Sequence, residues 1–150
     1  MNGSRFMATT DSLNRCVKNA IEDERQRVKK MRRDHPDVKH RITDYAAATV
    51  ACGYKRSGTT FKGYSASPVG HKYTENIKRR LETLAPIGDK RPGCKNIVGA
   101  CAEPHAADKV MKTFPGCKMD ELQFSNAYRP RTAKRLRCCQ NCKDTFTEVL

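Results

Sequence analysis

Three cysteines constrain the fold of this chain more than any other residues. Cys139 and Cys142, in the segment RCCQNCKDTF, form a C-x-x-C motif at a predicted loop-to-helix junction, and Cys101 stands at the predicted start of another helix. The C-x-x-C spacing lets two thiolates converge on one Zn²⁺ ion, aided by the N–H groups and positive end of the helix. If the two helix starts face one another, three sulfurs bind one zinc per chain and leave a fourth position open, as in catalytic zinc sites.

Two further polar residues follow Cys101 in the segment CAEPH. We interpret Glu103 as a general acid and base that moves the protons of a water at the open zinc position, without being a ligand itself. Alternatively, Glu103 is only a first-turn carboxylate that faces the helix dipole. His105, at i+4 from Cys101, could complete a closed Cys₃His structural site. A redox role for C-x-x-C is a further alternative, but a third cysteine adjoins it and no thioredoxin-like strand precedes it.

Hydrophobic periodicity predicts alternating helices and strands, and therefore an α/β fold. Apolar residues at helical spacing indicate a first helix that Asp11 caps and Pro36 closes. Two apolar segments flank the turn GYKRSG and indicate a β-hairpin. The expected order is helix 11–33, strand 45–52, strand 59–67, a short helix capped by Thr74, loop 85–99, helix 101–113, strand 121–128 and helix 139–149.

The charge of the chain favours a polyanionic partner. Lys and Arg outnumber Asp and Glu by 30 to 16, which gives a net charge of +14. Nucleic acid is favoured over a membrane surface, although charge also serves simply to keep a chain in solution. No apolar run approaches the roughly 18 residues of a membrane span, so we expect no membrane partner.

The cations concentrate just before the C-x-x-C motif. This segment is either a solvated loop or a phosphate-binding rim for a single strand; its basic residues are Arg129, Arg131, Lys134, Arg135 and Arg137. Aromatic side chains that could stack on bases are Tyr64, His71, Tyr73 and Tyr128.

C-A-E at one helix start and C-x-x-C at a later one resemble the motifs of the zinc-dependent cytidine deaminase superfamily. The chain is most similar to the YwqJ-type and related deaminase domains of bacterial polymorphic toxins. The resemblance covers about residues 42–150 and implies a three-layer fold with a short mixed sheet flanked by helices. Residues 1–41 would then be an N-terminal helical segment that packs on this domain.

The resemblance also implies roles for individual residues. Cys101, Cys139 and Cys142 match the zinc ligands, and Glu103 matches the proton shuttle. The strand FKGYSAS matches the strand that contacts the nucleoside. From this match and from the basic and aromatic residues above, we expect the substrate-binding residues to be Tyr64, Ser65, Ser67, His71, His105, Tyr128, Arg129, Arg131 and Arg135.

Three departures from the family pattern matter. Cys138 replaces the proline that usually precedes C-x-x-C. Ser65 and Ser67 stand where free-nucleoside deaminases carry Asn and Glu, which argues against a free nucleoside as the substrate. The chain ends at Leu150, so we expect a short sheet whose edge is covered by the N-terminal helix or a partner chain.

The sequence therefore predicts a zinc hydrolase that converts cytosine to uracil in single-stranded nucleic acid, with DNA preferred to RNA only on the resemblance. Alternatives are a free-nucleotide deaminase, an RNA adenine deaminase, and a non-enzymatic zinc-stabilised nucleic-acid-binding module. The segment MNGSRFMATTD lacks the apolar core of a signal peptide. We expect delivery within a larger secreted toxin, action in the target-cell cytoplasm, and an immunity protein as a partner.

Overall fold

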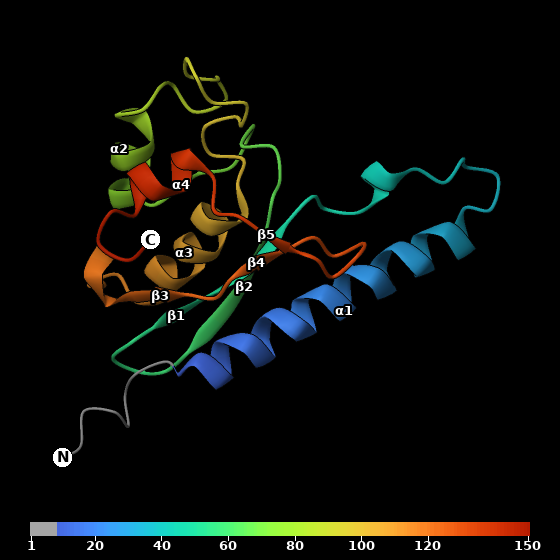
Figure 1. The fold of residues 1–150 in the computed structure, drawn as a ribbon, viewed down its shortest axis with the longest axis horizontal. Helices are drawn as coiled ribbons and strands as arrows, with labels where there is room; N and C mark the ends of the chain where they lie inside the picture. Colours follow the sequence, from blue (N-terminus) through green and yellow to red (C-terminus); the bar gives the residue numbers. More distant parts are fainter. Residues whose placement is uncertain (1–8) are drawn as a thin grey trace.

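A five-stranded sheet lies between α1 on one face and three shorter helices on the other in the computed structural model, which describes residues 9–150 (Figure 1). The helices are α1 (Thr10–Asp34), α2 (Glu75–Glu82), α3 (Ala102–Thr113) and α4 (Gln140–Thr145). The strands are β1 (Thr49–Tyr54), β2 (Thr60–Tyr64), β3 (Leu122–Phe124), β4 (Ala127–Tyr128) and β5 (Arg135–Leu136). The expected α/β class with helices on both faces is confirmed.

Every strand pairing within residues 9–150 is antiparallel, so the expectation of a mixed sheet is wrong. The strand order is β2-β1-β4-β5, and β3 also pairs with β1. The segment expected to be a basic loop is a β-hairpin instead, closed by a hydrogen bond from the Arg129 N–H to the Lys134 carbonyl at 2.8 Å. Short hairpin connections join antiparallel neighbours, whereas parallel neighbours need a long crossover.

The strand predicted at 121–128 is present but interrupted. From the pair Cys52–Phe124 to the pair Thr49–Tyr128, β1 advances by three residues and its partner by four, so one extra residue is inserted. This β-bulge divides the strand into β3 and β4. At the bulge the Ser125 hydroxyl accepts a hydrogen bond of 2.9 Å from the β1 backbone. Bulges often redirect a strand beside a functional site.

The apolar stripe predicted for the first helix is confirmed. Leu13 and Val17 pack against Ala51 of β1. Helix α1 therefore covers a face of the sheet, whereas one prediction was that it would cover an edge. The cap is Thr9 in place of the predicted Asp11, because the Thr9 hydroxyl accepts from the Ser12 N–H at 3.1 Å.

The larger part of the core lies on the opposite face of the sheet. Val50 and Cys52 of β1 alternate with Ala51 and join the cluster formed by α2, α3 and the C-terminal segment. Phe146 is fully buried in this cluster and leaves the helical conformation with φ −111°. Packing of this ring ends α4 at Thr145, earlier than the predicted residue 149.

The other boundaries differ by a few residues. β1 begins at Thr49 and continues through Gly53 into the predicted turn, and α2 ends at Glu82, before Pro86. No helix within the described residues is long and apolar enough to cross a bilayer. Residues 1–8, which hold most of the segment that lacks a signal-peptide core, lie outside the described residues.

Gly63 allows β2 to approach α3. A Cβ at this position would lie 2.4 Å from the Ala106 nitrogen and 2.7 Å from the Ala102 carbonyl oxygen, both backbone atoms that cannot move aside easily. Gly63→Ala is therefore expected to lower the free energy of unfolding by about 1–3 kcal/mol, the usual cost of overpacking. Chemical denaturation checks this. Gly116→Ala, where a Cβ meets no atom within 4 Å, is the control, and equal stability of the two variants would contradict the close approach.

Candidate metal centre

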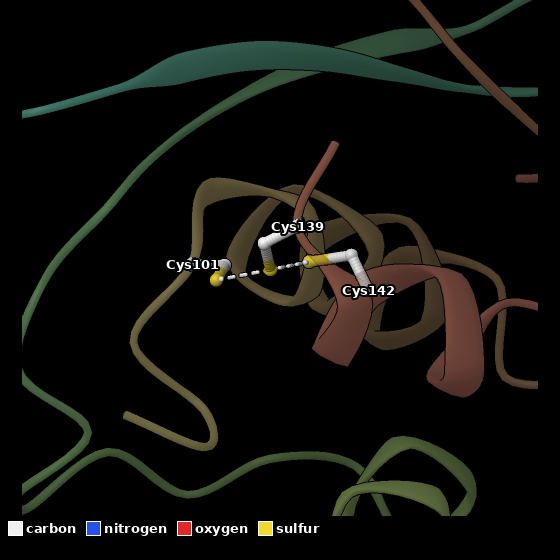
Figure 2. A group of neighbouring side chains, drawn as sticks. All are labelled: Cys101, Cys139 and Cys142. Atoms are coloured by element: carbon white, nitrogen blue, oxygen red, sulfur yellow. Dashed lines mark hydrogen bonds between the residues drawn. The ribbon is translucent and has the colours of Figure 1, made fainter. Parts of the chain in front are cut away.

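Cys101, Cys139 and Cys142 form a cluster between the first turns of α3 and α4 (Figure 2). The Cys139 Sγ lies 3.1 Å from the Cys101 Sγ and 3.6 Å from the Cys142 Sγ. All three sulfurs lie within 4.8 Å of one another. The fold thus brings together the three cysteines that the sequence predicted as ligands.

The local structure explains how two of these sulfurs reach the same place. Cys101 and Cys139 are the N-cap residues of α3 and α4, with nearly identical extended backbones at φ −70°, ψ 159° and φ −74°, ψ 160°. An N-cap side chain lies beside the free N–H groups of the first helical turn. The backbone N–H groups of Cys142 and Asn141 help to lower the pKa of Cys139, after the larger effects of the Cys101 and Cys142 thiols, an environment that favours a thiolate.

The three thiols share their protons unequally. Hydrogen bonding with the thiols of Cys101 and Cys142 lowers the pKa of Cys139. The hydrogen bond with Cys139 raises the pKa of Cys101, and the hydrogen bond with Cys101 raises the pKa of Cys142. Cys139 is therefore the sulfur most ready to bind a cation, and metal binding would release protons from the other two.

The cluster fits one zinc ion. Zn–S bonds of about 2.3 Å in tetrahedral geometry place the sulfurs about 3.8 Å apart, close to the separations of 3.1 Å and 3.6 Å. A disulfide would require about 2.05 Å, and all eight cysteines are free. Three thiolates suit zinc and leave one tetrahedral position for another ligand.

Glu103 lies in the first turn of α3, beside the sulfur cluster. Its side chain is buried, with 6% exposed, yet it lines the cavity in front of the cysteines. Burial raises the pKa of its carboxyl group, and the neighbouring Cys139 sulfur acts in the same direction. A buried carboxyl group with a raised pKa that borders a cavity is suited to both accept and donate a proton.

Cys138 creates a second donor group that overlaps with the first. One donor atom from each of Glu103, Cys138 and Cys142 also lies within 4.8 Å of the others. Cys142 belongs to both groups, so Cys138 and Glu103 lie beside the first group and are themselves the candidate ligands of the second. The sequence showed Cys138 only as a replacement for a family proline. Its place beside Glu103 was not foreseen.

A cavity of about 520 Å³ opens in front of the cluster. Cys101, Glu103 and Cys139 line its base. Four basic residues line it as well: Lys90, Lys95, Arg129 and Arg137. No ion pair within residues 9–150 involves any of these four side chains. The cavity therefore combines half-buried thiol groups and a buried carboxyl group with cationic side chains that form no ion pair within residues 9–150.

Sequence reasoning missed the contacts that hold loop 85–99 against α4. The Arg91 Nε donates to the Asn141 side-chain oxygen at 2.8 Å, and the Arg91 guanidinium also pairs with Asp144. Asn141 is buried and donates to the Asn96 carbonyl at 3.0 Å. Asn141 stands between the two cysteines of C-x-x-C, so this network positions both the ligands and the loop that carries Lys90 and Lys95. Its position inside the motif was the only sequence signal.

The predicted substrate-binding residues divide into two sets. Ser65 and Arg129 line the cavity of the metal centre, and Arg135 lies in an adjoining cavity that Glu103 and Cys138 also line. Arg131 and Ser67 are exposed and do not line the metal cavity. Ser67 accepts a hydrogen bond from the Val69 N–H at 3.3 Å, in a turn after β2.

The aromatic candidates are held by other contacts. The Tyr64 hydroxyl donates to the Ala20 carbonyl of α1 at 2.7 Å, and Tyr128 packs against Leu13 and Val17. Tyr73 is buried and donates to the Gly99 carbonyl at 2.6 Å. These rings support the fold, and none of them lines the metal cavity.

The two predicted histidines form a separate group. The rings of His71 and His105 lie 4.8 Å apart between centroids. The His71 Nε2 is 2.9 Å from a carboxylate oxygen of the buried Asp108, and the His105 Nε2 is 3.3 Å from the Ala66 carbonyl. Neither metal-binding group within the described residues includes a histidine. The closed Cys₃His alternative therefore finds no support in the geometry.

Compared with known proteins, the chain matches no protein-family model, no curated protein and no solved structure.

Proposed function

We propose that this protein is a zinc-dependent deaminase that converts cytosine to uracil in single-stranded nucleic acid. One observation carries the proposal: three thiols converge, and two of them, Cys101 and Cys139, line a cavity with cationic walls together with the buried carboxyl of Glu103. This arrangement supports hydrolysis at a metal with an open position, and the cationic walls favour a phosphate-bearing substrate.

Cys101, Cys139 and Cys142 would hold the zinc, which when bound supplies Lewis-acid activation of water. Glu103 performs the proton transfers. Its carboxylate accepts a proton from the water that adds to C4 of cytosine, and it delivers that proton to N3. Glu103 then transfers the proton of the new C4 hydroxyl group to the exocyclic amine, the C4–N bond breaks as the C4 carbonyl forms, and ammonia leaves, which gives uracil.

The free cations would bind the sugar–phosphate backbone of the strand. Lys90 and Lys95 come from loop 85–99, and Arg129 and Arg137 come from the β4–β5 hairpin, so positive charge flanks the cavity on two sides. A nucleobase must leave the base stack to reach Glu103 inside the cavity. We therefore infer an unpaired or single-stranded substrate, with DNA expected ahead of RNA on the sequence resemblance alone.

A second candidate function is a non-enzymatic zinc-stabilised nucleic-acid-binding module. Cys138 favours it, because this thiol lies within reach of Cys142 and Glu103 and a fourth thiolate would close the coordination of the zinc. Against it, the Cys138 sulfur does not belong to the group of mutually close donors that Cys101 and Cys139 form. A fully coordinated zinc could not activate water, so the two functions differ in turnover.

The direct test is to incubate the zinc-loaded protein with single-stranded DNA and RNA oligonucleotides and to sequence the products. Conversion of cytosine to uracil, read as C-to-T change, is the expected result. Conversion of adenosine to inosine would show that adenine, and not cytosine, is the target base. Tight binding with no base change would favour the binding module.

Neutralising three arginines of the β4–β5 hairpin tests the expected phosphate contacts. The triple variant Arg129→Gln, Arg131→Gln, Arg135→Gln should bind a single-stranded oligonucleotide more weakly, because each phosphate contact releases counterions. The slope of log K against log salt concentration is negative, and the loss of three contacts should make it less negative by about 2. Fluorescence anisotropy over a salt series measures it.

The matched control neutralises three exposed cations of α1: Lys18, Lys29 and Arg33. This control should change the salt slope less than the hairpin variant does. An unchanged slope in the hairpin variant would mean that the hairpin is only solvated surface.

A further inference from the structure

A second cavity, of about 740 Å³, adjoins the cavity of the metal centre. Ala47, Ser65, Ala100 and Arg129 line both cavities, so the two share a wall. The other lining residues come from α1, from residues 42–46, and from Ala66 and Arg131. Helix α1 lies outside the segment that resembles the deaminases. Its volume lies within the roughly 300–1,000 Å³ of small-molecule sites.

The wall contributed by α1 is built around a buried charge. Glu24 is 5% exposed, although it occupies the apolar face of α1 between Ala20 and Val28. Arg27 donates to its two carboxylate oxygens at 2.7 Å and 2.9 Å, and the Ala46 N–H donates to it at 2.6 Å. These bonds fix residues 42–46 against α1, so the cavity exists before any ligand binds. A preformed site loses little entropy on binding.

The chemistry of the second cavity suits a nucleotide. Arg129 and Arg131 line it, are exposed, and form no ion pair with any residue between 9 and 150. Half-buried Tyr45 supplies an aromatic ring, which the Arg32 guanidinium approaches at 5.2 Å from the centroid. Free guanidinium groups bind phosphate, and aromatic rings next to small apolar side chains accept a planar base.

Building on the proposed function, we propose that the second cavity binds the nucleotide adjacent to the target cytosine. Arg129, which borders both cavities, contacts the phosphate that joins the two nucleotides. Arg131 and Tyr45 contact the neighbouring nucleotide itself. The substrate is then a strand of at least two nucleotides, and the cavity under α1 determines which flanking base is preferred.

The test uses the zinc-loaded full chain and single-stranded DNA oligonucleotides with one cytosine between randomised neighbours. Ala46→Trp fills the second cavity and Arg131→Ala removes a cation that lines it but not the metal cavity. Both should lower the deamination rate about tenfold, since loss of a stacked or phosphate-bound neighbour weakens binding by that order. Both should also flatten the base preference at one flanking position.

Two control variants match these changes in size and charge. Asn14→Trp and Lys29→Ala alter exposed α1 positions that line neither cavity, and both should keep the wild-type rate and preference. Arg131 is an exposed side chain, so its variant tests the proposal even if Ala46→Trp fails to fold. An Arg131→Ala protein with wild-type rate and wild-type flanking preference would overturn the proposal.

Photocrosslinking separates this proposal from the proposed function, because it does not require turnover. An oligonucleotide with 4-thiothymidine beside the cytosine should crosslink to the tryptic peptide of residues 42–55, which contains Tyr45 and Ala46. The probe is placed on the 5′ side of the cytosine in one oligonucleotide and on the 3′ side in another. If the protein deaminates but neither oligonucleotide gives this crosslink, the second site is refuted and the deaminase function stands. No base change in any oligonucleotide would refute the deaminase function, and the proposed role of the second cavity with it.

Discussion

Glu103→Ala is expected to lower the rate of cytosine deamination by a factor of about 10²–10⁴ while the zinc content stays at one ion per chain. General acid–base groups contribute rate factors of this size, and Glu103 is the buried carboxyl beside the sulfur cluster. Because one group serves several proton transfers, the upper end of the range is expected. Steady-state kinetics on a single-stranded oligonucleotide, with metal analysis of the same sample, measures both quantities.

The thermal stability of the Glu103→Ala protein should stay close to that of the wild type. Burial of the carboxyl group raises its pKa, so it costs free energy in its charged form and its removal is tolerated. Glu103→Gln keeps the shape of the side chain but cannot transfer protons, and it should be as inactive as Glu103→Ala. A Glu103→Ala protein that deaminates at a near wild-type rate would refute the mechanism.

The zinc content of Glu103→Ala distinguishes the two donor groups. Loss of zinc would mean that Glu103 is a ligand together with Cys138 and Cys142. His105→Ala, by contrast, should keep both zinc and most of the activity, because the His105 ring is held at the Ala66 carbonyl and belongs to neither donor group.

Cys139→Ser and Cys142→Ser are each expected to abolish stoichiometric zinc binding. Cys139 is the central sulfur of the cluster, and Cys142 belongs to both donor groups. Affinity should fall by more than the roughly 10–100-fold that loss of an outer-shell partner costs. Metal analysis after dialysis against a competing chelator measures the loss, and deamination should disappear with the metal.

Zinc binding should also stabilise the fold, since it joins the start of α3 to the start of α4. At a free zinc concentration 1,000-fold above Kd, the stabilisation is about 4 kcal/mol. The melting temperature should therefore fall on chelation in the wild type but not in Cys139→Ser. Cys16→Ser is the control, because Cys16 belongs to neither donor group, and it should keep zinc. Full zinc retention in Cys139→Ser would remove the basis for the site.

Some of the candidate site was predictable because it depends on local chain geometry. Two cysteines three residues apart at a helix start place both sulfurs on one side of the first turn, whatever the rest of the chain does. Cys101 and Glu103 are only two residues apart, a spacing that does not place two side chains on one helix face, so their pairing was predicted from the C-A-E motif and not from periodicity. The burial of Leu13 and Val17 followed from the period of the helix in the same way.

Residues that depend on tertiary pairing were not predictable from pattern alone. Tyr64 and Tyr128 have the chemistry to stack on bases, but the sheet places both against α1. Glu24 occupies the apolar face of α1, a signal that a buried charge needs a partner, yet the partner Ala46 lies 22 residues away. Which side chains meet across such separations is decided by strand register and helix packing, which no local pattern encodes.

The sequence by itself determined the candidate ligands, the acidic residue in the same helix start, the order of the helices and of the first two strands, and the excess of positive charge. Only the tertiary structure decided that the two cysteine-bearing helix starts meet, that Arg129 lines the cavity beside them while His105 belongs to neither candidate donor group, and that α1 lines a second cavity. The reason is physical. Covalent geometry and helical periodicity act over a few residues, whereas a site forms from side chains that antiparallel pairing, a bulge and the core bring together from distant parts of the chain.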